Sequence, residues 1–208
     1  MTESRNLQRE QAIYRAALDL IAQGASPAAM KVQDIAQAAG IGKGTVYEYF
    51  SSKEEILRGM ALYCFDSEIA HIRTRFAACV SLSDLEDAVV GFIQDLAGSR
   101  MATYKVIADS LGGSCPPCGA AARMEELRSL TAETMERLRR AGEIDPALSQ
   151  DYCAGALLSA AAGGILRLCA PPELTEGAGE DIRLLIRRAL RAEPSTAGRG
   201  AHPFPAEN

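Results

Sequence analysis

Apolar residues recur every three or four positions along most of the chain, which is the spacing of one face of an α-helix. The pattern is longest over residues 52–78, where one apolar stripe runs the length of the segment. Its members are Leu57, Met60, Ala61, Cys64, Phe65, Ile69, Ile72 and Phe76. No stretch of the sequence alternates apolar and polar residues as a strand does. The sequence therefore predicts an all-α protein of about nine helices.

Glycine, proline and serine divide this pattern into segments. Helices are expected at about 6–23, 32–39, 42–49, 52–78, 83–97, 100–111, 120–141, 145–169 and 180–191. Ser52 with Glu55 and Ser83 with Glu86 have the spacing of a capping box, and Asp145 with Pro146 has that of a cap followed by a first-turn proline. We expect two domains, residues 1–51 and 52–192, and a disordered tail over 193–208.

The segment Val32–Phe50, VQDIAQAAGIGKGTVYEYF, is typical of a DNA-reading helix-turn-helix. Its first helix has apolar residues at helical spacing, and Gly40 supplies the turn. The second helix is anchored by Val46 and Phe50, which leaves polar residues to point outward. These are Lys43, Thr45, Tyr47, Glu48 and Tyr49.

The run DIAQAAGIGKGTVYEYFSSKEEIL resembles the most recognisable segment of the TetR family of bacterial transcriptional repressors. The resemblance implies a homodimer that binds a double-stranded DNA operator and responds to a small-molecule effector. It also implies which residues contact DNA: Lys31, Lys43, Gly44, Thr45, Tyr47, Tyr49 and Lys53. Gly42 and Lys31 stand where the family usually has hydroxyl residues, so two side-chain caps are missing, and Lys31 offers a cation instead.

Charge alone does not identify a nucleic-acid protein. The 208 residues are 48% hydrophobic with a net charge of −5, which excludes a broadly basic surface. Between Lys31 and Arg58, acidic and basic residues balance. The N-terminus lacks an apolar run, and the longest apolar stretch, residues 153–166, is shorter than the roughly 20 residues that span a bilayer. We expect a cytoplasmic protein without a membrane segment.

Small residues in the segment 145–169 would let a partner helix approach closely. In the family that the sequence resembles, the last two helices pair with their symmetry mates in a four-helix dimer interface. The predicted interface residues are Gly155, Ala156, Ala160, Ala161, Gly164, Ile182, Leu185, Ile186 and Ala189. The alternative is that these residues pack only within their own chain.

The resemblance also implies an effector pocket among the middle helices. Aromatic and methionine side chains are plausible lining residues. They are Phe65, Phe92, Met101, Tyr104, Met124 and Met135. Each could equally be ordinary core.

Cys115 and Cys118, in the motif CPPC, are not explained by the family resemblance. A pair of thiols just before a helix is expected to have lowered pKa values and could form a regulatory disulfide or hold half of a thiophilic metal site. A redox- or metal-sensing repressor is therefore one alternative. A thiol oxidoreductase is a remote one, because the chain lacks the βαβ pattern that usually frames such a motif. We expect no catalytic residues and no cofactor, and assign no metal site.

Overall fold

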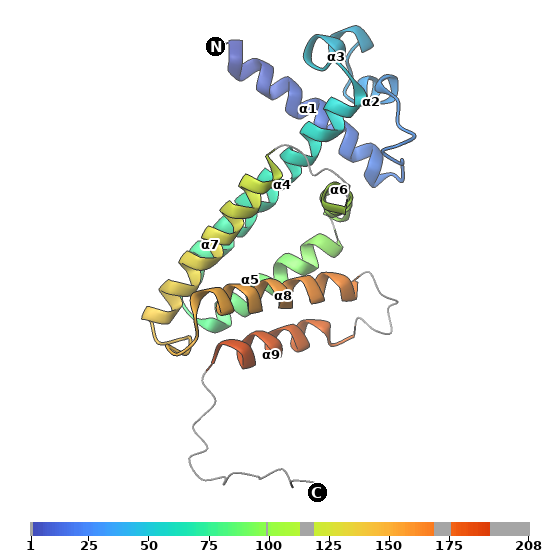
Figure 1. Cartoon of the computed structure of the whole chain (residues 1–208). Helices are drawn as coiled ribbons and strands as arrows, with labels where there is room; N and C mark the ends of the chain where they lie inside the picture. Colours follow the sequence, from blue (N-terminus) through green and yellow to red (C-terminus); the bar gives the residue numbers. More distant parts are fainter. Residues whose placement is uncertain (1, 99, 113–118, 169–175, 192–208) are drawn as a thin grey trace, which may run out of the picture.

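The computed structural model describes residues 2–98, 100–112, 119–168 and 176–191. Within these residues the chain forms helices and no strand, so the predicted all-α class is confirmed. The helices are α1 (Thr2–Ala22), α2 (Val32–Ala38), α3 (Lys43–Tyr49), α4 (Lys53–Ala78), α5 (Leu82–Ala97), α6 (Met101–Gly112), α7 (Ala120–Arg140), α8 (Gln150–Leu168) and α9 (Ala178–Leu190). Figure 1 shows α1–α3 at one end, α5, α8 and α9 at the other, and α4 with α7 connecting them.

The first hydrophobic core lies among α1, α2, α3 and the start of α4. Its buried residues are Ile13, Ala17, Ile21, Met30, Val32, Ile35, Ala36, Val46, Phe50, Ile56, Met60, Ala61, Cys64 and Val106. The turn between α2 and α3 is closed by N–H groups of Gly40 and Ile41, which donate to the carbonyls of Gln37 and Ala36 at 3.1 and 3.0 Å. Gly40 has a φ of +67°, which glycine adopts without strain. This turn fixes α3 against α2.

The helix α4 contributes to both cores. Its N-terminal cap is Ser52, whose Oγ accepts a hydrogen bond from the Glu55 N–H at 3.1 Å, as the sequence predicts. The Glu55 carboxylate instead accepts from Ser51, through its hydroxyl and its N–H, and these bonds lower the pKa of Glu55. With 26 residues, α4 is about 39 Å long. Its N-terminal half packs in the first core and Phe76 in the second.

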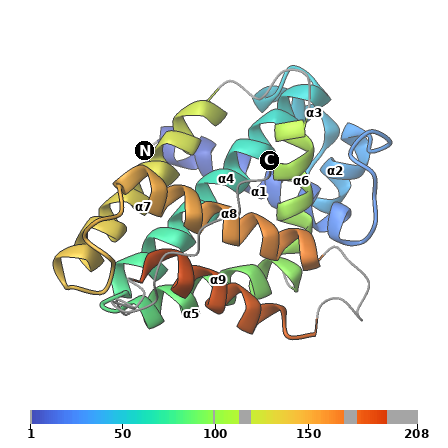
Figure 2. The ribbon, with the colours of Figure 1, turned by 60° about the horizontal axis from the view of Figure 1, so that its bottom comes forward.

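The second hydrophobic core lies among α5, α7, α8, α9 and the end of α4 (Figure 2). Its buried residues are Phe76, Cys79, Leu82, Leu85, Ala88, Val89, Val90, Ile93, Met135, Leu138, Ile144, Cys153, Leu157, Ala160, Ile182, Ile186 and Leu190. The buried Glu86 carboxylate of α5 accepts two hydrogen bonds from Arg187 of α9, at 3.0 and 2.6 Å. These bonds tie two helices that are distant in sequence.

Two predicted helix starts are wrong. The cap of α5 is Ser81, whose Oγ accepts from the Asp84 N–H at 3.2 Å; the predicted pair Ser83 and Glu86 lies inside the helix. The helix α8 begins at Gln150, after Ser149, whose Oγ accepts from the Tyr152 N–H at 3.2 Å; the Asp145 side chain instead accepts from the Ala147 N–H in a turn.

None of the described helices is long and apolar enough to cross a membrane. The apolar stretch over residues 153–166 lies in α8, where it packs against α5, α7 and α9.

Candidate DNA-reading helix and interior cavity

The helix α3 presents a polar face at one end of the molecule. Val46 and Phe50 are buried in the first core, as the sequence predicts. Tyr47 is 49% exposed, and the Lys43 ammonium lies 5.8 Å from the centre of its ring. A cation and a phenol therefore share one exposed face, an arrangement that can bind phosphate oxygens or base edges.

The other predicted DNA contacts surround this face but differ in accessibility. Gly44 is exposed with open space beside its Cα, whereas Thr45 and Tyr49 are half-buried. Lys31 is exposed at the start of α2, where its N–H donates to the Asp34 carboxylate at 2.9 Å. Lys53 is half-buried, and its ammonium donates to the Ala28 carbonyl at 2.8 Å. Lys53 therefore also holds the loop between α1 and α2.

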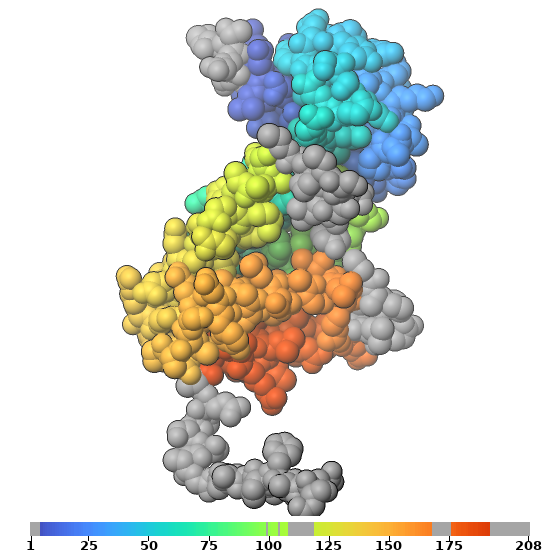
Figure 3. All heavy atoms as spheres, viewed as in Figure 1, coloured from blue at the N-terminus to red at the C-terminus, as the bar shows by residue number. Residues whose placement is uncertain are grey.

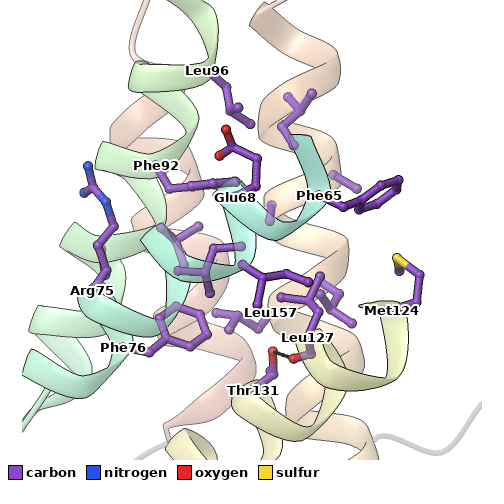
Figure 4. Close-up of a pocket in the computed structure, with 18 of the residues that line it drawn as sticks. Phe65, Glu68, Arg75, Phe76, Phe92, Leu96, Met124, Leu127, Thr131 and Leu157 are labelled. Carbon is purple, nitrogen blue, oxygen red and sulfur yellow. Dashed lines mark hydrogen bonds between the residues drawn. The ribbon is translucent and has the colours of Figure 1, made fainter. Parts of the chain in front are cut away.

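A cavity of about 410 Å³ lies between α4, α5, α7 and α8 (Figure 4). Its volume falls in the range of small-molecule sites. The lining residues are Phe65, Glu68, Ile69, Ile72, Arg75, Phe76, Ala88, Val89, Phe92, Leu96, Ile107, Arg123, Met124, Leu127, Thr131, Leu157, Leu158, Ala161, Ala162 and Ile165. Most of this surface is aliphatic or aromatic, so an apolar ligand would fit it.

The structure brings together half of the residues predicted to line a pocket. Phe65, Phe92 and Met124 line the cavity from three different helices. Met135 is fully buried in the packed part of the second core, and half-buried Met101 lies outside the cavity wall. The side chain of Tyr104 is outside the described residues.

Sequence reasoning missed the polar residues of the cavity, above all Glu68. This side chain is only 6% exposed, and its Oε2 accepts a hydrogen bond from Arg100 at 2.6 Å. Burial raises the pKa of Glu68, and the charge of Arg100 partly opposes that rise. Glu68 is four residues after Cys64 and three after Phe65, so helical spacing places it on the apolar stripe of α4, which is the signal that could have identified it.

The predicted interface residues of α8 and α9 do not share one outward face. Ile182 and Ile186 are buried in the second core, and a Cβ on Gly164 would lie 2.6 Å from the Cδ1 of Ile182. Ala160 is buried too, whereas Gly155 and Leu185 are exposed; Ala156, Ala161 and Ala189 are half-buried. The buried members pack within their own chain because α8 and α9 adjoin each other and α5.

Among the large apolar side chains that α8 and α9 expose, Leu185 alone belongs to the predicted set. The exposed side chains are Tyr152, Leu158, Leu166, Leu184 and Leu185. Figure 3 shows the surfaces of these two helices side by side, at the end of the molecule away from α3.

The CPPC cysteines, Cys115 and Cys118, lie outside the described residues. Cys64, Cys79 and Cys153 are free thiols buried in the cores. Burial, followed by the nearby Glu68 charge, raises the pKa of Cys64 to about 12. In the part of the chain that the structure describes, no group of histidine, cysteine and acidic residues could hold a metal ion.

The fold of this chain is similar to the folds of known regulators over most of its length. FadR from Bacillus subtilis, whose crystal structure contains stearoyl-CoA, is 18% identical with a TM-score of 0.65, over 85% of this chain and 97% of that one. The TetR family transcriptional regulator PfmR from Thermus thermophilus is 21% identical with a TM-score of 0.63, over 84% and 97%. SmeT, the repressor of the Stenotrophomonas maltophilia multidrug efflux pump SmeDEF, is 17% identical with a TM-score of 0.66, over 94% and 97%.

The family is identified by the N-terminal sequence. No curated protein sequence matches the chain. Residues 13–60, which include α2 and α3, match the profile of the family described as bacterial regulatory proteins, tetR family. Residues 13–60 therefore belong by sequence to the TetR family of bacterial regulatory proteins, and the chain has the fold of such regulators over most of its length.

Proposed function

We propose that the protein is a homodimeric transcriptional repressor that binds a palindromic operator and releases it when a small molecule enters the cavity. One observation carries this proposal. The helix α4 is continuous from the core that holds α3 to the cavity between α4, α5, α7 and α8. A ligand that displaces the cavity end of α4 would therefore move the reading helix. We assign no catalytic activity.

The proposed DNA face is the exposed side of α3. Lys43 and Tyr47 would contact phosphates and base edges first, since both are exposed and adjacent. Lys31 would add a phosphate contact at the start of α2, and Lys53 would add one after giving up its bond to Ala28. This assignment places the DNA-binding domain at residues 1–51 and the regulatory domain at 52–192.

The proposed dimer interface is the outer face of α8 and α9. Gly155 and Ala162 are small and exposed on α8, and large apolar side chains flank them at Leu158 and Leu166. Leu185 of α9 would join them in an isologous contact, because a two-fold axis brings the same patch of both subunits together. Such a dimer would place two reading helices about 34–36 Å apart, one turn of DNA, on a palindrome.

The proposed release follows from a difference in ligand affinity between two shapes of the dimer. If the DNA-bound shape binds the ligand more weakly, ligand binding must weaken DNA binding by the same factor. Coupling energies of this kind are typically about 1–3 kcal/mol, or roughly 5- to 150-fold in affinity. The cavity lies against α4, the helix whose other end packs beside α3 in the first core.

The DNA face is tested with a palindrome enriched from a random duplex library. We predict that Tyr47→Ala weakens binding to this duplex about tenfold or more, because it removes a hydrogen bond to a charged group. Lys43→Ala should weaken binding and lower the slope of log affinity against log salt by about 0.9. Fluorescence anisotropy measures both effects.

The matched control is Lys105→Ala, which removes another exposed lysine, from α6. It should leave the affinity and the salt slope unchanged. Wild-type affinity in both α3 variants, with unchanged helical content, would show that α3 is not the DNA face.

A further inference from the structure

The described residues include two buried glutamates, Glu68 of α4 and Glu86 of α5, that differ in how they are paired. Glu86 has both carboxylate oxygens bound to Arg187. Glu68 has only one oxygen bound, its Oε2 to Arg100. The Oε1 atom of Glu68 is buried and has no hydrogen-bond partner among the described residues. Leaving such an atom without a donor is unfavourable, typically by about 1–3 kcal/mol. Glu86 is thus a completed structural pair, whereas Glu68 keeps one acceptor available.

The unpaired oxygen belongs to the cavity. Glu68 is one of the lining residues, and Figure 4 shows its carboxylate at the end of the cavity near Phe92 and Leu96. Arg100 donates to only one of the two oxygens. Its own Nε is also buried without a partner among the described residues. The guanidinium also lies over the ring of Phe92, with Cζ 5.7 Å from the ring centre.

The other polar groups of the wall are already bound. Arg75 forms an ion pair with Asp95, and Arg123 binds both oxygens of Asp66 at 2.7 Å. The Thr131 hydroxyl donates to the Leu127 carbonyl at 2.9 Å. Within the described part of the wall, both arginines are thus already paired with carboxylates and are not left for an anionic ligand group.

The charges of Glu68 and Arg100 limit which ligand groups can bind Oε1. Because Arg100 already balances the charge of Glu68, a protonated amine would bring a second, uncompensated positive charge into an apolar cavity. A carboxylate would lie against the Glu68 carboxylate and would be repelled. A neutral O–H or N–H group would satisfy Oε1 without adding charge.

We propose that the cavity takes an uncharged, largely apolar ligand with a single hydroxyl or other neutral hydrogen-bond donor, and that this donor binds Oε1 of Glu68. The inference rests on the proposed function, in which a small molecule occupies the cavity. It makes Glu68 the residue that determines which ligand is accepted. The remaining walls select for an apolar body of matching size.

The experiment compares four decyl compounds that differ only at one end: 1-decanol, decyl methyl ether, decylamine and decanoate. Each competes with the fluorescent apolar probe N-phenyl-1-naphthylamine for the full-length protein. We expect 1-decanol to bind about tenfold more tightly than the ether, because only the alcohol can donate to the carboxylate. The amine and the carboxylate should both bind more weakly than the alcohol.

Two variants assign the effect to one residue. In Glu68→Gln the amide oxygen can accept from Arg100 and leave the NH2 group facing the cavity, so it can donate to alcohol and ether alike. The preference for 1-decanol should then fall to about one. Thr131→Val, which removes a hydroxyl from the wall, should keep the preference because that hydroxyl is not the proposed acceptor.

The possible results show whether the inference alone fails or whether the proposed function fails with it. Equal binding of alcohol and ether by the wild-type protein would overturn the inference and leave the effector cavity intact; this comparison holds even if Glu68→Gln does not fold. Tighter binding of the amine or the carboxylate, or a preference that survives Glu68→Gln, would also overturn it. If the naphthylamine probe does not bind, or no compound displaces it, the cavity is not a ligand site and both proposals fail.

Discussion

The two cores that α4 joins differ in how completely they are filled. In the first core, Ile13, Ile35, Ala36, Val46 and Ile56 are fully buried and pack against one another. The second core also has fully buried residues, between α5, α8 and α9, but the apolar cavity opens beside it, toward α4 and α7. A filled core moves as one body, whereas a hollow one can change shape when the space is occupied. The first core is therefore suited to carry the reading helix and the second to respond to a ligand.

The contact between α1 and α4 explains how a change in one region would reach the other. A Cβ at Gly59 would collide with the Tyr14 hydroxyl, so the Tyr14 side chain of α1 packs directly against the backbone of α4. The Tyr14 ring also packs against Phe50 and Tyr63, with ring centres 5.5 and 5.8 Å away. These contacts hold the N-terminal part of α4 against α1 and against Phe50, the residue that follows α3. A tilt of α4 would therefore move α3 as well.

The largest expected effect comes from a charge on the outer face of α9, compared with the same change on the outer face of α1. Leu185 of α9 and Leu7 of α1 are similarly exposed, at 59% and 55%. We predict that Leu185→Glu raises the dimer dissociation constant on the order of 100-fold, because the proposed interface would bury an unpaired carboxylate from each subunit. Leu7→Glu should leave the dimer intact. Sedimentation velocity distinguishes these outcomes, and equal dimerisation of both variants would place the interface elsewhere.

A smaller effect should distinguish the filled core from the hollow one. Ala36 is fully buried in the first core, and Ala88 is buried but lines the cavity. We predict that Ala36→Leu lowers the free energy of unfolding by about 1–3 kcal/mol, because no space exists for the larger side chain. Ala88→Leu should cost less than about 1 kcal/mol, since it can extend into the cavity. Urea unfolding measures both, and equal losses would contradict the contrast between the cores.

The smallest expected effect is a pH dependence of the free energy of unfolding, caused by Tyr14 at the first core. Burial, with help from Glu10 and Glu55, raises the pKa of Tyr14 from 10.0 to about 12. The folded protein therefore holds the neutral phenol, and this stabilisation is complete below pH 10 and is lost as the pH rises through 12. Unfolding curves should show less loss of stability over this interval in Tyr14→Phe than in the wild type. Parallel losses in the two proteins would rule out Tyr14 as the cause.

The first region could be predicted closely from sequence because its determinants are local. The turn at Gly40, the anchors Val46 and Phe50, and the Ser52 cap all depend on residues a few positions apart. The start of α5 was harder, because Ser81 with Asp84 and Ser83 with Glu86 have the same spacing. In the structure Ser81 and Asp84 form the cap, whereas the Glu86 carboxylate is bound by Arg187 of α9, a contact between residues distant in sequence.

The cavity and the outer face of α8 could be predicted only in part, because both depend on how distant helices pack. Met135 and Met124 lie on the same helix, yet one is in the packed core and the other at the cavity. Ile186 and Leu185 are neighbours in sequence, and only the position of α9 against α5 and α8 decides which of them is buried. Periodicity identifies an apolar face but not the partner that covers it.

In the proposed function the cavity beside the second core controls the reading helix in the first, and reciprocal linkage tests this control directly. The measurement is the affinity of the wild-type dimer for its selected palindrome with and without saturating 1-decanol, and the affinity for 1-decanol with and without saturating DNA. We predict that decanol weakens DNA binding and DNA weakens decanol binding by one common factor, between about 5 and 150. DNA affinity that is unchanged by a decanol-filled cavity, and responds instead to oxidation of the CPPC thiols, would contradict it.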